Sequence, residues 1–188
     1  IKEFIEGTQL IDQNNNIETF FKIQINKDSS NISFFDKSSF RYVEYFNFGT
    51  SIIFKDITKV CSINYEIIKK ILTDKSFKNK SFEDTEMLEN KYFTQGNHRK
   101  IRKKLIQDIV NARIEEITNI ILNKNINIEL FKKKNTTIYI IIEDQFILDN
   151  FKENFKFYIS KEYNFESHLI NNFKIETSIM SAAHLSIY

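Results

Sequence analysis

The sequence has 188 residues, of which 41% are hydrophobic and 28% charged, so it is long enough to bury a core as one domain or two small lobes. Its acidic and basic residues are interspersed and leave a net charge of +2, which excludes a global field that would attract nucleic acid or an anionic membrane. A single cysteine, Cys61, excludes a disulfide scaffold, and no apolar run is long enough to span a membrane. The chain begins at Ile1 without a methionine, so we expect it to be part of a longer protein.

The first half of the chain predicts an antiparallel meander followed by helices. Residues 1–19 are polar and weakly patterned, whereas three β-rich runs at 20–26, 31–36 and 40–48 are joined by short polar turns. After Gly49 the apolar residues recur with helical spacing, and Asn64 is placed to cap a second helix. The first of these helices carries an apolar stripe, which consists of Ile52, Ile53, Ile57 and Val60. We expect Cys61 to be a small core residue.

The second half predicts helices alternating with strands. A short helix at 84–90 and a strand at 92–93 precede a long helix over residues 99–124. Beyond it we expect a buried strand at 136–142, a short helix at 146–151, a strand at 155–160 and an amphipathic helix at 175–187. This alternation is typical of an α/β layer architecture.

Charged residues interrupt the apolar faces of the predicted long helix. Arg102, Arg113 and Glu116 fall in the seam between two apolar stripes, with Arg99 at its edge, and a charge in such a place must be paired. One interpretation is an internal ion pair between Arg113 and Glu116, three residues apart. The other is a row of guanidinium groups that binds a carboxylate-bearing peptide. The basic run at 98–104 has no RNA-binding motif or zinc-finger spacing beside it, so we expect no nucleic-acid partner.

The order of these landmarks resembles the C-terminal half of the FtsA family, bacterial actin-like cell-division proteins. The resemblance covers about residues 20–188 and depends on three places: Gly49 with residues 56–57, the Glu66/Lys69 pair, and the segment ARIEEI at 112–117. It implies half of an actin-like ATPase domain of the ribonuclease H-like class, with a mixed sheet, helices and a small inserted subdomain. Residues 20–75 and 125–188 would form subdomain 2A, residues 76–124 the inserted subdomain 2B, and residues 1–19 the tail of a preceding element.

The resemblance also implies partners and a location. Proteins of this family bind the C-terminal tail of FtsZ on subdomain 2B, which maps here onto Arg113 and Glu116, and with them Arg99 and Arg102. They self-associate into filaments and tether the division ring to the cytoplasmic face of the cell membrane. The anchoring segment would lie outside this chain.

The family binds ATP with Mg²⁺, but the glycine-rich phosphate turns are absent from this chain. The turns that correspond to them, at 24–29 and 143–146, contain no glycine and carry acidic residues, so no Gly-rich phosphate loop is present. Lys27, Ser29 and Gly49 remain as weak candidates for a phosphate contact. Glu66 and Lys69 either grip an adenosine, as in actin-like proteins, or form a plain surface pair.

No enzyme chemistry is predicted from the residues themselves. The three histidines, His98, His168 and His184, are scattered without metal-ligand spacing, and no nucleophile signature occurs. An actin-superfamily ATPase, such as a pilus-type relative, is the alternative to an FtsA-type adaptor. A scaffold fragment with no site of its own is the third possibility.

Overall fold

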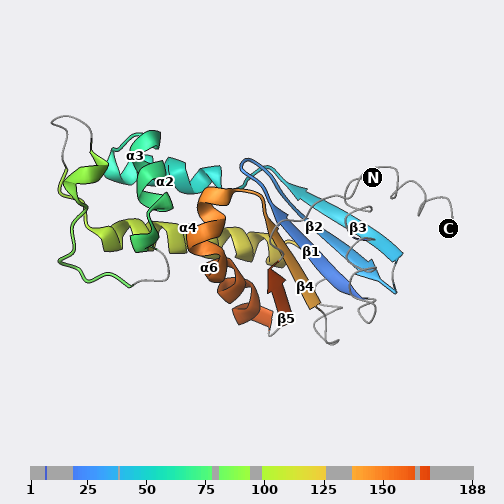
Figure 1. Cartoon of the computed structure of the whole chain (residues 1–188). Coiled ribbons are helices and arrows are strands. Elements are labelled where there is room, and N and C mark those ends of the chain that lie inside the picture. The colour runs from blue at the N-terminus through green and yellow to red at the C-terminus, as the bar shows by residue number, and fades with distance from the viewer. Residues whose placement is uncertain are drawn as a thin grey trace.

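The computed structural model of the chain describes residues 7, 19–37, 39–77, 81–93, 99–125, 137–163 and 166–169. A sheet forms one end of the described molecule, and the helices extend from it toward the other end (Figure 1). Five strands make up this sheet, in the order β3-β2-β1-β4-β5. The strands are β1 (Phe20–Ile25), β2 (Ser30–Asp36), β3 (Ser39–Phe46), β4 (Thr137–Ile142) and β5 (Glu166–Leu169).

The sheet is mixed. Strands β1, β2 and β3 form an antiparallel meander, as predicted from the three β-rich runs. Strand β4 pairs with β1 in parallel, and β5 pairs with β4 in parallel. Residues 117 positions apart in sequence, such as Phe20 and Thr137, therefore lie side by side. The carboxyl ends of β1 and β4 therefore meet at one edge of the sheet.

Both faces of the central strands are buried, which explains the nearly continuous apolar sequence of β4. Strands β1 and β2 also bury polar residues, among them Lys22 and Gln24. On one face, Phe21 and Ile23 belong to the main core beneath the helices. On the other, the ring of Phe20 stacks on Phe35 with centroids 4.7 Å apart and meets Tyr139 edge-on at 5.3 Å. The period of two in a strand assigns neighbouring residues to these two faces.

Helices α2 (Ser51–Cys61) and α3 (Tyr65–Thr73) confirm the two helices predicted after Gly49. The Asn64 side chain caps α3 by accepting a hydrogen bond of 3.0 Å from the Ile67 N–H, which satisfies one of the free donors at the helix start. Cys61 is buried in the core as expected, and burial raises the pKa of its thiol. Within the predicted apolar stripe of α2, Ile53 and Ile57 are buried, whereas Val60 is 57% exposed.

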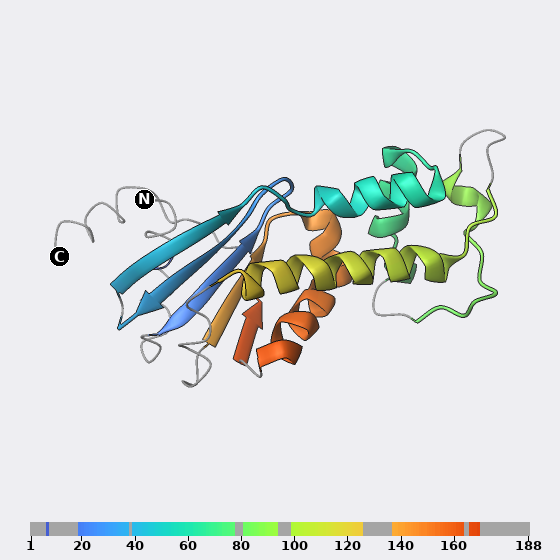
Figure 2. The same ribbon diagram turned by 180° about the vertical axis from the view of Figure 1, so that it is seen from behind.

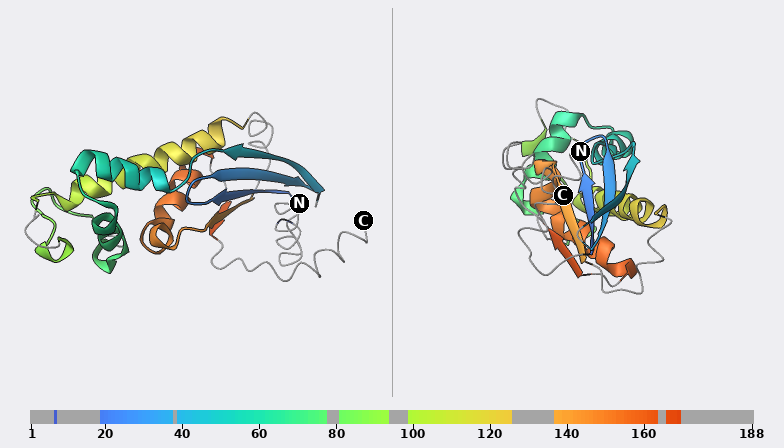
Figure 3. Two further views of the ribbon diagram at one scale, coloured as in Figure 1. Left: turned by 90° about the horizontal axis from the view of Figure 1, so that it is seen from above. Right: turned by 90° about the vertical axis from the view of Figure 1, so that its right-hand side faces the viewer.

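Helix α4 (Lys103–Asn123) runs from the far end of the helical part back to the sheet (Figure 3). Its principal apolar stripe is fully buried as predicted, and consists of Ile106, Val110, Ile114, Ile117 and Ile121. The polar residue Thr118 is buried as well: it is 1% exposed and donates its hydroxyl hydrogen to the Ile114 carbonyl at 3.0 Å. Figure 2 shows α2 and α4 lying alongside each other.

Helix α4 begins four residues later than predicted, because the preceding segment is held in an extended conformation. Arg102 forms an isolated antiparallel bridge with Met87. The bridge uses the Lys103 N–H, which donates to the Glu86 carbonyl at 2.9 Å, and the Leu88 N–H, which donates to the Ile101 carbonyl at 2.8 Å. The predicted helix at 84–90 and strand at 92–93 are replaced by this bridge and by the 3₁₀ helix η2 (Asn90–Tyr92). Another 3₁₀ helix, η1 (Lys75–Phe77), follows α3 directly.

Helix α6 (Gln145–Tyr163) replaces the predicted short helix at 146–151 and strand at 155–160. Phe151, Phe155 and Ile159 are all buried, and their spacing of four residues is that of one helical face. The aromatic and β-branched content of the segment favoured a strand locally, but burial against α3 and α4 decides its structure. Strand β5 was not predicted, and the helix predicted at 175–187 lies outside the described residues.

Candidate functional site

Three separate loops meet at the carboxyl ends of β1 and β4, the edge where open α/β sheets bind ligands. They are the turn between β1 and β2 at residues 26–29, the entry to α2 at Gly49 and Thr50, and the turn after β4 at Glu143. The Thr50 N–H donates to the Asn26 carbonyl at 3.0 Å, and the Glu143 N–H donates to the Ile25 carbonyl at 3.1 Å. The structure thus places Lys27, Ser29 and Gly49 at this edge, whereas a phosphate contact by these residues stays a prediction.

Gly49 is required at this edge by the close approach of the neighbouring turn. A Cβ atom built on Gly49 would lie 2.1 Å from the Asn26 carbonyl oxygen and 2.7 Å from that of Lys27. Both obstacles are backbone atoms, which cannot rotate away as a flexible side chain can. Gly49 therefore fixes the start of α2 against the turn between β1 and β2.

Acceptors of the chain itself occupy the donors at this edge. The Ser51 N–H, at the start of α2, donates to the Lys27 carbonyl at 2.8 Å. The Thr50 hydroxyl donates to Asp144 Oδ2 at 2.7 Å, and Gln24 Nε2 donates to Glu143 Oε1 at 2.6 Å. Gln24 is 2% exposed and its Oε1 has no hydrogen-bond partner, so the edge carries a surplus of acceptors.

This arrangement does not fit the phosphates of ATP. A phosphate cradle needs backbone N–H groups that point at the ligand, but those of Thr50 and Ser51 already bind carbonyls of the turn. The carboxylates of Glu143 and Asp144 would repel a polyphosphate at short range. The turn at 26–29 contains one cationic residue, Lys27, which is exposed. The carboxylate of the next residue, Asp28, opposes its charge.

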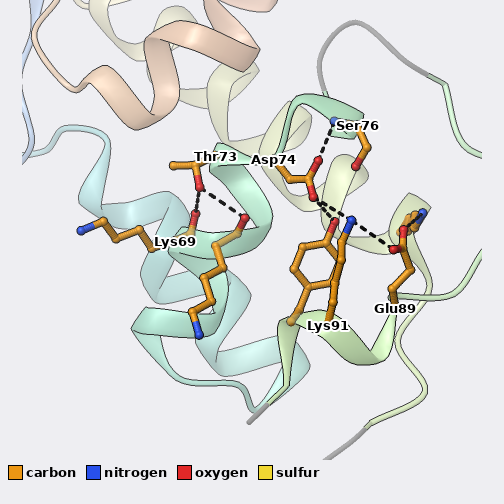
Figure 4. Close-up of polar contacts among 9 residues, drawn as sticks. Lys69, Thr73, Asp74, Ser76, Glu89 and Lys91 are labelled. Carbon is orange, nitrogen blue, oxygen red and sulfur yellow. Dashed lines mark hydrogen bonds and ion pairs between the residues drawn. The ribbon is translucent and has the colours of Figure 1, made fainter.

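The second part of the expected nucleotide site lies on another element. Glu66 and Lys69 both belong to α3, which packs against α2 and α6. Glu66 is exposed and Lys69 is half-buried, and Lys69 points away from the polar group around Asp74 (Figure 4). An adenosine contact by this pair stays a prediction.

Arg113 lies on α4 and joins this helix to α2. Its Nε donates to Asp56 Oδ2 at 2.6 Å, its Nη2 also contacts that oxygen, and its Nη1 contacts Glu116 Oε2 at 2.5 Å. The internal ion pair between Arg113 and Glu116 is therefore present, with Asp56 as a further partner that the sequence did not reveal. The Arg113 side chain is 23% exposed, and the Glu116 side chain is 52% exposed.

The other two arginines of the predicted row lie before α4 rather than in its seam. Arg102 occupies the N-cap position in an extended conformation, and its side chain makes no capping hydrogen bond. Arg99 precedes it in the chain. Both are exposed. Since a helix rises 1.5 Å per residue, Arg102 and Arg113 are separated by about 16 Å along the axis, so the expected continuous row is broken into two places.

A shallow depression, here called the α4 depression, lies on the C-terminal half of the same helix. It is lined by Ala112, Glu115, Glu116, Asn119, Ile120, Asn123 and Lys124. These residues recur at three- and four-residue intervals and so share one face of α4. Glu116 is common to the depression and to the ion pair with Arg113.

A polar network around Asp74 was missed by sequence reasoning. Asp74, at the end of α3, accepts hydrogen bonds from the Ser76 N–H at 2.8 Å and from the Tyr92 hydroxyl at 2.7 Å, and pairs with Lys91 at 3.0 Å (Figure 4). The Ser76 N–H, followed by the Tyr92 hydroxyl, holds the pKa of the Asp74 carboxyl well below its usual range. Lys91 and Lys103 both pair with Glu89, at 3.0 and 3.2 Å. The network fastens the segment between α3 and α4, and no sequence spacing announces it.

Two classes of feature are absent from the part of the chain that the structure describes. No group of three or more His, Cys, Asp or Glu side chains could hold a metal ion there. None of the described helices combines the length and apolarity that crossing a membrane requires.

No protein-family model and no curated protein matches the sequence, but solved structures match the fold. The chain is similar to the ethanolamine utilization protein EutJ from Carboxydothermus hydrogenoformans, with a TM-score of 0.54 and 14% identity over 88% of this chain and 47% of that one. It is also similar to the PilM-PilN type IV pilus biogenesis complex, with a TM-score of 0.59 and 9% identity over 96% and 46% of the two chains.

A third neighbour is Ta0583, an archaeal actin homolog, with a TM-score of 0.55 and 9% identity over 93% of this chain and 51% of that one. The chain thus has the fold of actin-like ATPase domains, as the sequence predicted. At this level of identity the likeness concerns the fold alone, and the chain spans about half the length of each neighbour.

Proposed function

We propose that the chain is half of an actin-like adaptor of the FtsA type, which docks the C-terminal tail of FtsZ on the outer face of α4. The observation that carries the proposal is the partly exposed Arg113, beside a depression that Glu116 also lines. A guanidinium can bind a carboxylate through two parallel N–H···O bonds, and the depression offers apolar contact with Ala112 and Ile120.

The peptide would lie along α4 from Arg113 toward Lys124. An extended chain advances about 3.3 Å per residue, so roughly five residues span the distance from Arg113 to the end of the helix. Arg99 and Arg102 lie beyond the other end of this path. They would contribute long-range attraction for an acidic tail rather than direct contacts with the same residues, and such attraction is screened by salt.

The remaining parts of this assignment depend on the same resemblance. We propose residues 20–75 and 125–188 as subdomain 2A and residues 76–124 as the inserted subdomain 2B. Self-association into filaments and attachment to the inner face of the cell membrane, through a segment outside this chain, complete the adaptor role. The neighbour PilM is described in a complex with PilN, so partner binding by a protein of this fold has a precedent.

The second candidate function is that of an actin-superfamily ATP-binding protein or ATPase. The actin-like fold favours this second function. In addition, the close approach of Gly49 to the turn between β1 and β2 keeps the carboxyl edge of the sheet compact. The occupied N–H groups and the carboxylates at the same edge favour the adaptor. Thermal unfolding with and without Mg²⁺-ATP separates the two, because a ligand that binds the native state raises the melting temperature.

The adaptor proposal is tested by titrating a fluorescent FtsZ C-terminal peptide with the chain and with Arg113→Glu. We expect saturable binding that the variant loses, since a charge reversal removes the guanidinium and adds a repulsive carboxylate. Lys104→Glu is the matched control: it makes the same charge change on the same helix, at a residue that pairs with Asp84 at 3.0 Å.

Circular dichroism confirms that each variant is folded before binding is measured. A folded wild-type chain that does not bind the peptide overturns the proposal, as does equal loss of binding in both variants. Arg113→Gln, which adds no negative charge, serves as a second variant if Arg113→Glu fails to fold.

A further inference from the structure

Asp56 occupies the side of the Arg113 guanidinium that a bound carboxylate would use. The Nε and Nη2 groups form the edge best suited to two parallel hydrogen bonds. In this chain both groups contact one atom, Asp56 Oδ2. The third contact, from Nη1, goes to Glu116.

The contact between Arg113 and Asp56 is not the most favourable geometry that a carboxylate can form with a guanidinium. Two N–H groups that share one oxygen bind less favourably than two groups that each have their own acceptor. A carboxylate brought by a partner can present both of its oxygens to this edge. It would therefore compete with Asp56 on favourable terms.

Release of Asp56 carries little cost, because the residue lies near the surface of α2. Its side chain is 26% exposed, so the freed carboxylate can be hydrated without movement of the helix. Because both side chains keep part of their exposure, separation of the pair leaves neither charge fully buried.

We propose that Asp56 is an internal competitor for the carboxylate of the docked peptide, and that the peptide displaces it from Arg113. The inference rests on the proposed function of α4 as a peptide-docking surface. Asp56 then sets the threshold of binding: a segment that brings no carboxylate cannot replace it, whereas an acidic tail can. This makes Asp56 a specificity-determining residue, although it belongs to α2 and lies outside the α4 depression.

The test compares binding of the fluorescent FtsZ C-terminal peptide to the full chain and to Asp56→Asn. Loss of the competitor should tighten binding by about fivefold, the factor that corresponds to an exposed ion pair of about 1 kcal/mol. Asp84→Asn is the matched control, since it also releases a cation of α4, Lys104, and should leave the affinity unchanged.

A second peptide, with its carboxylates replaced by amides, tests the chemistry of the competition. It should bind the chain and Asp56→Asn equally, because it cannot use the freed edge of Arg113. Asp56→Ser provides a second variant if the asparagine substitution disturbs folding, which urea unfolding of each protein detects.

The outcomes separate the inference from the proposed function. Measurable binding that is equal or weaker in Asp56→Asn overturns the competition while leaving peptide docking intact. A gain that the amidated peptide shares overturns it as well. Absence of binding to both folded proteins overturns the docking function, and the inference with it.

Discussion

Replacement of Gly49 by alanine tests how the edge of the sheet is held together. The added Cβ would lie 2.1 Å from the Asn26 carbonyl oxygen, so either the turn or the start of α2 must move. The movement disrupts two backbone hydrogen bonds, from the N–H groups of Thr50 and Ser51 to the carbonyls of Asn26 and Lys27. Each is worth about 0.5–1.5 kcal/mol, and unrelieved steric repulsion adds to their loss.

The net effect is smaller than the sum, because alanine also restricts the unfolded chain, which returns about 0.4–1 kcal/mol. We therefore expect Gly49→Ala to lower the free energy of unfolding by about 2 kcal/mol. For a chain of this length that corresponds to a fall in Tm of about 4–8 °C. Urea unfolding followed by circular dichroism measures the free energy, and an unchanged m-value shows that the unfolding transition is the same one.

The control for Gly49→Ala is Asp28→Ala, in the same turn. Asp28 is exposed, so its removal should change the free energy of unfolding by less than about 0.5 kcal/mol. A Gly49→Ala protein as stable as the wild type would refute the reasoning. It would mean that the turn between β1 and β2 shifts freely, and that the entry to α2 does not depend on it.

Two further predictions concern the C-terminal ends of α3 and α2. The pKa of Asp74 is depressed in the folded chain, so ionised Asp74 contributes fully to stability above its unfolded pKa of about 3.9, and this contribution is lost as pH falls toward the lower, folded pKa. The difference in free energy of unfolding between the wild type and Asp74→Asn should therefore shrink from pH 6 to pH 2. A difference that does not change with pH in urea unfolding would contradict this. Ser62 ends α2 with a φ of 51°, a left-handed conformation that glycine adopts without strain. Ser62→Gly should therefore raise the free energy of unfolding by about 0.5–1 kcal/mol. A lower free energy of unfolding in this variant would show that the serine has another role.

The proposed docking surface on α4 and the sheet edge are both connected to helix α2. Helix α2 begins at the edge, where Thr50 and Ser51 bind the turn, and Asp56 contacts Arg113 further along. Measurements of peptide affinity in Gly49→Ala and of stability in Asp56→Asn would reveal whether these two contacts act independently. Distant sites without shared partners are expected to be additive.

Local pattern alone determined much of the fold. The β-rich content of three runs, separated by polar turns, predicted strands β1 to β3, and the run of β-branched residues predicted β4. Both signals are properties of neighbouring residues. The cap of α3 by Asn64 followed from residue type and position. The buried stripe of α4 followed from helical spacing, which a side chain far away does not alter.

Tertiary structure decided the features that join distant segments. Phe151, Phe155 and Ile159 face one core, which makes α6 a single helix where the local sequence favoured a strand. The bridge between Met87 and Arg102 delays the start of α4 and moves Arg102 out of the predicted seam. These outcomes depend on which segments meet in space, and sequence periodicity carries no information about that.

The sequence by itself determined that the sheet edge cannot offer a glycine-rich phosphate loop, because its turns at 24–29 and 143–146 contain no glycine. It also singled out Arg113 and its neighbour in sequence, Glu116. Only the tertiary structure supplied Asp56 as the principal partner of Arg113, and the Asn26 carbonyl as the reason for Gly49. Each of these contacts joins residues more than twenty positions apart, and the fold brings them together through packing that no local pattern encodes.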